Sequence, residues 1–314
     1  MIMKKRVYGV AGIKSIMSNW YADFTGRPKT TSNGDIFGSD KAFKYPIKRM
    51  WQSEGEKVLY IKSYKMEKSG KKNEGEKLQP RDLNERYEQI FGSKLDKNTP
   101  STEVLSNLFS AIDVMNFGAT FAEKDQNISI TGAVQIGQGF NKYKESNIET
   151  QDILSPFRNP SEDKEEATAS SLGSKIVTDE AHYFYPFSVN PKNYDDYLGL
   201  GIDGFEGYTV EAYEKFNKGC LVASTAFNSN SKVGCENEFA LFITCKEDSD
   251  LYLANLDRYI DFDKQGDRYK ISLNKLSKLL KNELDAIESI QVYYNELEME
   301  VDTYELPCTL KSIY

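Results

Sequence analysis

The sequence of 314 residues predicts an α+β fold in which long polar insertions interrupt a compact core. Apolar and small residues alternate over residues 6–17, which indicates a strand buried on at least one face. Apolar side chains then recur at helical spacing over residues 41–53, and strand and helix patterns continue to alternate toward the C-terminus. Two segments, 64–100 and 141–182, lack this regularity. This order of elements suits an α+β core of the ferredoxin or RRM type that carries large inserted lobes.

Turn, capping and proline residues predict the loop and the helix that follow the first strand. The loop is rich in turn-forming residues, and its Asn33-Gly34 pair is typical of a hairpin turn. Asp40 is expected to cap the helix at residues 41–53. Pro46 lies in the second turn of this helix and should distort it, because proline supplies no backbone N–H.

The remaining elements are assigned in the same way. The segment 64–100 is lysine-rich and polar, so we expect an inserted lobe there. The segment 141–182 is expected to form a long protruding loop. The other expected elements are strands at 58–63, 114–122, 128–136, 183–189, 239–245, 252–262 and 291–295, and helices at 83–91, after Thr102, at 209–227 and at 272–289.

Composition restricts the classes of function. The four cysteines are widely spaced, which favours reduced thiols, and His182 is the single histidine, which leaves little material for an enzyme site. We therefore expect no metal and no cofactor. No apolar run approaches the roughly 18–20 residues that a membrane-spanning helix needs, and no signal-peptide pattern follows the basic N-terminus. We expect a cytoplasmic protein with no membrane partner.

Charge is distributed unevenly along the chain, whose net charge is −8. Residues 1–100 contain 21 Lys and Arg against 12 Asp and Glu, a net of +9, whereas the remainder contains 19 against 36, a net of −17. This division permits a basic face on an acidic body, or contact between the basic end of one copy and the acidic end of another. An uneven scatter of solvated charges is the alternative.

A set of cations between residues 27 and 49 is the strongest candidate for a binding site. Cations clustered on one surface bind polyanions, and nearby glycines let the backbone approach phosphates closely. Composition alone slightly favours a solvated helix face, because lysines along one side of a helix are common. The members of this candidate set are Arg27, Lys29, Lys41, Lys44, Lys48 and Arg49.

Three weaker motifs have structural explanations that are as good or better. Gln135 and Gln138 lie among glycines in GAVQIGQGF, which could be a backbone edge close to nucleic acid or simply a glycine-rich strand end. GLGIDG at 199–204 matches a dinucleotide-binding pattern but follows no buried strand, so we expect a loop. Asp23, Asp35 and Asp40 could hold a divalent metal, although turn and capping roles explain Asp35 and Asp40 as well.

Several motifs, in order along most of the chain, resemble one family. They are GIKSIMSNWYADFTGRP, SDKAFKYPIKRMW, DVMNFGATFA, GAVQIGQGFN and NSNSKVG. The chain resembles the helical-backbone subunit of type I CRISPR effector complexes (Cascade), the Cas-seven family of the RAMP superfamily, with subtype I-B the closest likeness. Asn19 to Asp23 stand where this family usually shows NPNGD.

The resemblance implies an RRM-like palm with inserted lobes and a protruding β-hairpin thumb. The palm would comprise residues 1–63, 101–140 and 183–314, with an inserted lobe at 64–100 and a thumb at 141–182. Several copies would stack along one CRISPR RNA and hold it by its backbone, target DNA would be recognised through the guide, and other Cascade subunits would be partners. The RNA contacts it suggests are Asn19, Arg27, Lys44, Lys48, Arg49 and Lys232, with Phe157, Arg158 and Lys175 on the thumb.

Backbone subunits of type I complexes are not nucleases, so the resemblance implies a non-catalytic RNA-binding scaffold. Related type III backbone subunits cut target RNA with a loop aspartate, which leaves a metal-dependent RNase centred on Asp23 as one alternative. A generic single-stranded RNA-binding module with no CRISPR role is the other.

Overall fold

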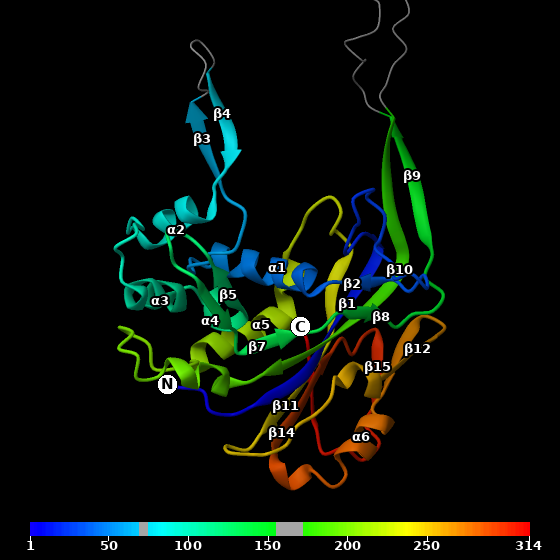
Figure 1. Cartoon of the computed structure of the whole chain (residues 1–314). Helices are drawn as coiled ribbons and strands as arrows, with labels where there is room; N and C mark the ends of the chain where they lie inside the picture. The colour runs from blue at the N-terminus through cyan, green and yellow to red at the C-terminus, as the bar shows by residue number, and fades with distance from the viewer. Residues whose placement is uncertain (69–74, 155–171) are drawn as a thin grey trace, which may run out of the picture.

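The computed structural model describes residues 1–68, 75–154 and 172–314. In this part of the chain the central element is a nine-stranded sheet with the order β16-β14-β11-β1-β10-β8-β2, in which β7 and β9 also pair with β10 (Figure 1). Its strands are β1 (Val7–Ser18), β2 (Phe37–Gly38), β7 (Val134–Ile136), β8 (Gly139–Asn141), β9 (Ile148–Leu154), β10 (Leu172–Val189), β11 (Cys235–Cys245), β14 (Ile287–Tyr294) and β16 (Thr309–Ser312).

The middle of this sheet is antiparallel and is built around β1. The strand β1 pairs with β10 on one side and β11 on the other, and β10 pairs with β7 and β8. Gly9 is required within β1, because a Cβ there would lie 2.4 Å from the Leu241 carbonyl oxygen. The strand expected at residues 6–17 is thus confirmed, and so is the mixed helix-and-strand class.

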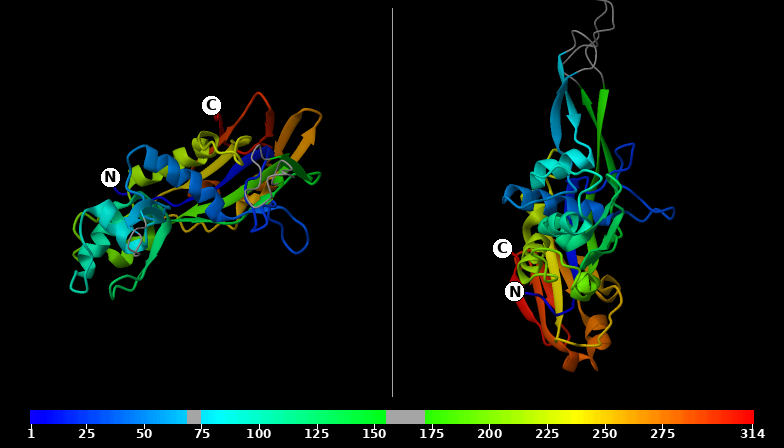
Figure 2. Two further views of the ribbon diagram at one scale, coloured as in Figure 1. Left: turned by 90° about the horizontal axis from the view of Figure 1, so that it is seen from above. Right: turned by 60° about the vertical axis from the view of Figure 1, so that its left-hand side comes forward.

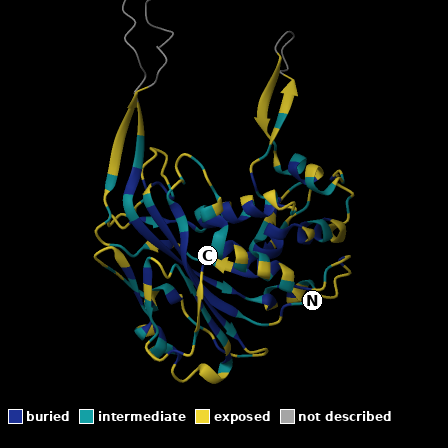
Figure 3. Cartoon of the chain, turned by 180° about the vertical axis from the view of Figure 1, so that it is seen from behind, coloured by how far each residue is buried: buried dark blue, intermediate teal, exposed yellow. Residues whose placement is uncertain are grey.

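Two helices cover one face of the sheet. These are α1 (Asp40–Ser53), which follows β2, and α5 (Val210–Ala226), which connects β10 to β11 (Figures 1 and 2). Phe43 of α1 stacks on Tyr185 of β10, with ring centroids 4.8 Å apart. The two helices approach closely at Gly219, where an added Cβ would meet Ile47 at 2.9 Å. Figure 3 shows the resulting core as buried strands under the inner faces of these helices.

The opposite face of the sheet is also covered. A second layer contains β12 (Asp261–Gln265), β13 (Arg268–Ser272), α6 (Asn274–Leu280) and β15 (Met299–Asp302). It buries Val10, Phe184 and Leu241, which point away from the α1–α5 face. An RRM sheet usually binds RNA on this open face. Here that face is part of a hydrophobic core, so any RNA contact must come from loops, helices or hairpins.

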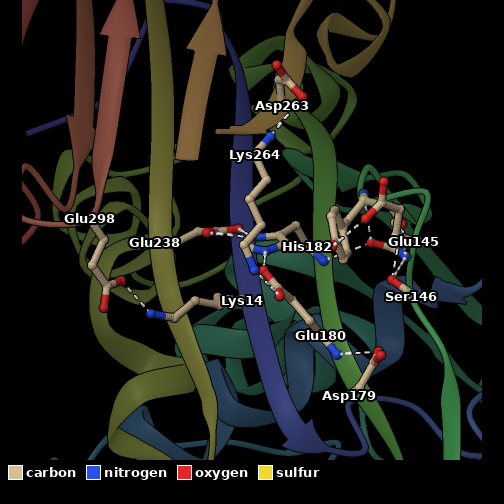
Figure 4. A network of polar contacts seen from close by, with 12 residues as sticks. Lys14, Glu145, Ser146, Asp179, Glu180, His182, Glu238, Asp263, Lys264 and Glu298 are labelled. Carbon is tan, nitrogen blue, oxygen red and sulfur yellow. Dashed lines mark hydrogen bonds and ion pairs between the residues drawn. The ribbon is translucent and has the colours of Figure 1, made fainter. Parts of the chain in front are cut away.

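A buried polar network ties this second layer to the sheet (Figure 4). His182 Nδ1 lies 2.8 Å from Glu238 Oε2, and His182 Nε2 lies 3.2 Å from Glu180 Oε1. Lys264 of β12 continues the chain of contacts, with its Nζ 2.5 Å from Glu180 Oε2. Burial alone would lower the pKa of His182, but the two carboxylates raise it above the ordinary histidine value. The hydrogen bond from His182 in turn lowers the pKa of Glu180 to about 2.

Two β-hairpins project from the body on the same side (Figures 1 and 3). One is β3 (Tyr64–Lys68) with β4 (Glu76–Pro80), in the segment expected to form an inserted lobe. The other is formed by β9 and the first half of β10, which pair over residues 148–154 and 172–178. The residue pattern of 141–182 predicted a long protruding loop, which this regular pairing corrects, whereas a protruding β-hairpin is what the family resemblance implied for this segment.

The remaining elements form a small helical lobe and short turns. They are α2 (Leu83–Phe91), α3 (Ser101–Ser110), α4 (Ile112–Phe117), β5 (Gly118–Phe121), β6 (Ile128–Thr131) and the 3₁₀ turns η1 (Pro191–Tyr197), η2 (Leu256–Tyr259) and η3 (Leu284–Ala286). The expected helices at 83–91 and 209–227 are confirmed. The part of the chain that the structure describes contains no helix long and apolar enough to cross a membrane.

Several expected boundaries are wrong for identifiable reasons. Ser39, not Asp40, caps α1, because its hydroxyl accepts the Ala42 N–H. Residues 58–63 form no strand, since the Asp113 carboxylate accepts the peptide N–H groups of Leu59 and Tyr60 in that segment. The strand expected from Val114 begins as helix α4, and the helix expected to reach residue 289 ends at Leu280.

Candidate nucleic-acid interface

Helix α1 presents an exposed stripe of two cations and one aromatic ring. Lys41, Tyr45 and Arg49 follow one another at intervals of four residues, which places them on one side of the helix. All three are exposed. The Tyr45 ring is held edge-on by Phe227, with centroids 5.4 Å apart. The stripe can therefore offer charge to phosphates and a fixed ring to a base or sugar.

Tyr45 is the member of this stripe that the sequence analysis missed. The signal was available, because Tyr45 lies four residues from both Lys41 and Arg49. The place of Phe227 beside it could not be foreseen, since that residue belongs to the end of α5.

A groove of about 290 Å³ lies beside the stripe, between α1 and the end of α5. Arg49 stands at its edge, where Nη1 donates to Gln52 Oε1 at 2.9 Å. The lining is otherwise mainly apolar, which suits a planar organic group better than a free ion. The lining residues are Pro46, Arg49, Met50, Ser53, Ala223, Ala226, Phe227 and Asn228.

Two other lysines of α1 are committed to contacts within the protein. Lys44 Nζ lies 3.0 Å from Asp40 Oδ2, one turn earlier. Lys48 Nζ lies 3.3 Å from Asp113 Oδ2, whose side chain is fully buried, and donates to the Tyr60 carbonyl oxygen. Burial lowers the pKa of Lys48. The structure thus divides the basic set of α1 into surface cations and a largely interior one.

The loop at residues 19–36 is organised by Asp23. Its Oδ1 accepts hydrogen bonds from the Thr25 N–H, the Thr25 hydroxyl and the Arg27 N–H, at 2.8, 2.7 and 3.0 Å. The hydrogen bond from the Thr25 hydroxyl is the main cause that lowers the pKa of Asp23. This geometry is an Asx turn, in which the carboxylate fixes its own loop. It presents Arg27 to solvent, while Lys29 Nζ lies 5.4 Å from the centroid of the Tyr21 ring.

Asn19 and Lys232 hold this loop against the body. Asn19 Nδ2 donates to the carbonyl oxygens of Gly26 and Ile176, both at 2.9 Å, and so ties the loop to the β9–β10 hairpin. Lys232 Nζ donates to the Asn19 carbonyl oxygen at 2.6 Å and also to that of Trp20. Burial lowers the pKa of Lys232. Both residues lie inside the loop junction, where they position the loop that carries Arg27.

The other candidate residues lie on different elements. Gln135, on β7, is exposed and donates to the Gly132 carbonyl oxygen at 2.8 Å. Gln138 is exposed between β7 and β8, and Lys175 lies on β10 opposite Gln151. Phe157 and Arg158 lie outside the described residues. The RNA-binding role of all these residues stays a prediction.

The described residues do not form a cluster of side chains that could bind a metal ion. Within residues 1–68, 75–154 and 172–314, no group of three or more His, Cys, Asp or Glu side chains could hold a metal ion. Asp35 and Asp40 do not join Asp23 in such a group. Asp40 instead pairs with Lys44.

Comparisons with known proteins place the chain among the CRISPR-associated proteins. The family model described as CRISPR-associated protein Cas7 matches residues 5–292, nearly the whole chain, and the protein belongs to this family. The resemblance found in the sequence motifs is therefore confirmed at the level of the family. None of the curated protein sequences compared with the chain matches it.

Solved structures agree with this assignment at the level of the fold. A chain described as "CRISPR RNA-guided surveillance complex, pre-nicking" matches with a TM-score of 0.60 and 13% identity, over 98% of this chain and 96% of that one. Another, described as "CRISPR RNA-guided surveillance complex", has a TM-score of 0.48 and 14% identity, over 94% and 91% of the two chains. The second score is too low to add to the comparison.

Proposed function

We propose that the protein is a CRISPR RNA-binding backbone subunit of a type I surveillance complex, of subtype I-B or a close relative. Membership of the Cas7 family supports the class. The single observation that carries the proposal is the exposed Lys41–Tyr45–Arg49 stripe, to which the Asp23 loop adds the exposed Arg27. Such a surface binds the backbone of RNA without selecting its sequence, because its cations contact phosphates and its ring accepts any base.

The parts of the molecule have separate roles in this proposal. We assign the antiparallel core β11-β1-β10-β7/β8, with α1 and α5, as the RRM-like palm. Residues 64–100 are the inserted lobe and the hairpin within residues 141–182 is the thumb. The protein is non-catalytic, and target DNA is recognised by pairing with the guide.

Copies of the protein assemble head to tail along the guide, together with the other Cascade subunits. The net charge of +9 in residues 1–100 and −17 in the remainder is compatible with this arrangement, because surfaces of opposite charge on neighbouring copies attract. A heterologous contact of this kind generates an open filament and does not close into a dimer.

The metal-dependent RNase is not favoured as a second function. One oxygen of the Asp23 carboxylate accepts three hydrogen bonds from its own loop, and among the described residues no group of three or more His, Cys, Asp or Glu side chains that could hold a metal ion includes it. Metal-dependent cleavage of RNA would need such a group of ligands around the carboxylate.

The proposal is tested by purifying the protein together with its neighbouring gene products and sizing the RNA that accompanies it. A discrete RNA containing one repeat and one spacer is the expected result. A random mixture of RNA would support the generic single-stranded RNA-binding module and contradict the CRISPR role.

A further inference from the structure

The imidazole of His182 lies between two carboxylates in the interior of the protein (Figure 4). The His182 side chain is fully buried. Its Nδ1 lies 2.9 and 2.8 Å from the two oxygens of Glu238, and its Nε2 lies 3.2 Å from Glu180 Oε1. An ionised carboxylate only accepts hydrogen bonds, so both ring nitrogens have to donate. With both carboxylates ionised, this arrangement suits only the imidazolium, which carries a proton on each nitrogen.

The two contacts of the ring are not equivalent. The Glu238 side chain is 3% exposed and the Glu180 side chain is 15% exposed. Glu180 also has a second cation, because Lys264 Nζ lies 2.5 Å from its Oε2. A neutral imidazole keeps a single N–H, and a buried carboxylate left without a donor is costly. The remaining proton therefore belongs on Nδ1, beside Glu238, and Nε2 then turns a lone pair toward Glu180.

The weaker contact lies where the second layer meets the β9–β10 hairpin. Glu180 is two residues beyond Thr178, the last residue of β10 that pairs with β9. Its partner Lys264 belongs to β12, which pairs with β13. Lys264 also lines a cleft of about 370 Å³ between residues 142–145 and 262–266. Glu180 and Lys264 thus have space to move outward together once Nε2 stops donating.

We propose that the contact between His182 Nε2 and Glu180 is a pH-sensitive latch, closed while the imidazole carries both protons, and that loss of the Nε2 proton loosens the β12–β13 layer at the base of the β9–β10 hairpin. The contacts that form this latch lie within one chain and involve no RNA. The inference is therefore independent of the guide-RNA proposal and can fail without it.

The other titratable groups around the ring are occupied by partners of their own. Lys14 of β1 is opposite His182 in the strand register, but its Nζ lies 2.5 Å from Glu298 and 3.2 Å from Glu236. The remaining groups are two tyrosines whose rings pack on the imidazole, Tyr143 and Tyr269, and two carboxylates, Glu145, which accepts the Tyr143 hydroxyl, and Asp263, which accepts the Lys264 N–H.

The direction of the response follows from these partners. Burial lowers the pKa of His182, but the Glu238 and Glu180 carboxylates outweigh it and raise the pKa above the ordinary 6.5. Burial raises the pKa of Tyr143 and of Tyr269, so both rings stay neutral while His182 titrates. The latch is therefore closed below 6.5 and opens as pH rises through the pKa of folded His182.

The first test follows the two ring nitrogens by NMR in the full chain labelled with ¹⁵N-histidine, in which His182 is the single histidine. As pH rises, the Nε2 signal should move to the chemical shift of an unprotonated nitrogen while Nδ1 stays protonated. Loss of the Nδ1 proton instead would overturn the proposal, because Glu180 would then keep its donor.

The second test measures hydrogen exchange of the β12–β13 amides relative to those of β14 in the same sample, at pH values on both sides of the measured pKa. The ratio should rise by about 10-fold for each pH unit between 6.5 and the folded pKa. In Lys264→Met the imidazole should still titrate, but the ratio should no longer depend on pH, because β12 has lost its link to Glu180.

Glu298→Gln is the matched control, since Glu298 pairs with Lys14 on the same face and not with His182. This variant should keep the pH response of the unmodified protein. A ratio that stays constant while His182 titrates would overturn the latch. A pH response that persists in Lys264→Met would overturn it as well, because the signal would then reach β12 by another route.

Discussion

Lys48 Nζ lies 3.3 Å from Asp113 Oδ2, and this contact joins helix α1 to helix α4. The same carboxylate accepts the peptide N–H groups of Leu59 and Tyr60, both at 2.8 Å. The fully buried Asp113 side chain therefore accepts from three donors that belong to two segments. Lys48, which helical spacing places with the surface lysines of α1, therefore has a structural role.

Replacing Lys48 by alanine should destabilise the fold. The change leaves the buried Asp113 carboxylate without its counter-charge, which costs about 3 kcal/mol of unfolding free energy. Urea denaturation followed by circular dichroism measures this loss. Lys41→Ala is the control, because its exposed side chain should change stability by less than about 0.5 kcal/mol. Equal effects of the two changes would contradict the structural role of Lys48.

Stability should fall as pH rises through the pKa of folded His182. The pKa of this group is raised on folding, so its contribution is complete below the unfolded value of 6.5 and is lost as pH rises through the folded value. His182 is the single histidine, so one imidazole NMR signal reports its titration. His182→Gln should flatten the pH dependence of the urea midpoint above pH 6.5. An NMR titration at or below 6.5 is incompatible with the bridged imidazolium.

Glu180 should make the stability of the protein depend on pH in the acidic range. Its pKa is lowered to about 2 in the folded protein, so its contribution is present above about 4.5 and is lost as pH falls toward 2. Glu180→Gln should weaken the protein at pH 7 and have less effect near pH 2. Lys264→Met is a useful companion, because it removes the other partner of the same carboxylate. If Glu180→Gln lowered the free energy of unfolding by the same amount at pH 7 and near pH 2, the result would argue against an ion-paired Glu180 carboxylate.

Asp23→Ala should weaken RNA binding without touching any catalysis. Its carboxylate fixes the turn that presents Arg27, so its loss allows the loop to move. Asp23→Asn keeps the Oδ1 acceptor and should restore most of the affinity. Cleavage of target RNA by the unmodified protein with Mg²⁺ would refute the structural role of Asp23.

The sequence predicted the element types better than the roles of individual lysines. Helical spacing located Lys41, Lys44 and Lys48 correctly on α1, but it cannot show that Asp113, far along the chain, draws Lys48 inward. The acidic residue in DVMNFGATFA was visible, yet nothing local marks it as the partner. Only the tertiary fold separates surface cations from interior ones.

The alternation of residues alone did not reveal the protruding hairpins, although the family resemblance implied a hairpin within residues 141–182. Strand patterns are recognised by alternation between a buried and an exposed face. Most of β9 is exposed on both faces, so its residues, IETQDIL, show little alternation. The helix expected to extend to residue 289 failed for the opposite reason. Its apolar spacing continues into η3 and β14, which bury Ile287 in the second core.

The central claim is that Arg27, Lys41 and Arg49 contact the RNA backbone, and the salt dependence of binding tests it most directly. Each lost contact with a single strand should reduce the slope of log K against log[salt] by roughly 0.7. Changing all three residues to alanine should thus flatten the slope by about 2, equally for RNAs of different sequence. Lys278→Ala is the control, because Lys278 is exposed on α6. A triple variant with an unchanged slope would contradict the proposed interface.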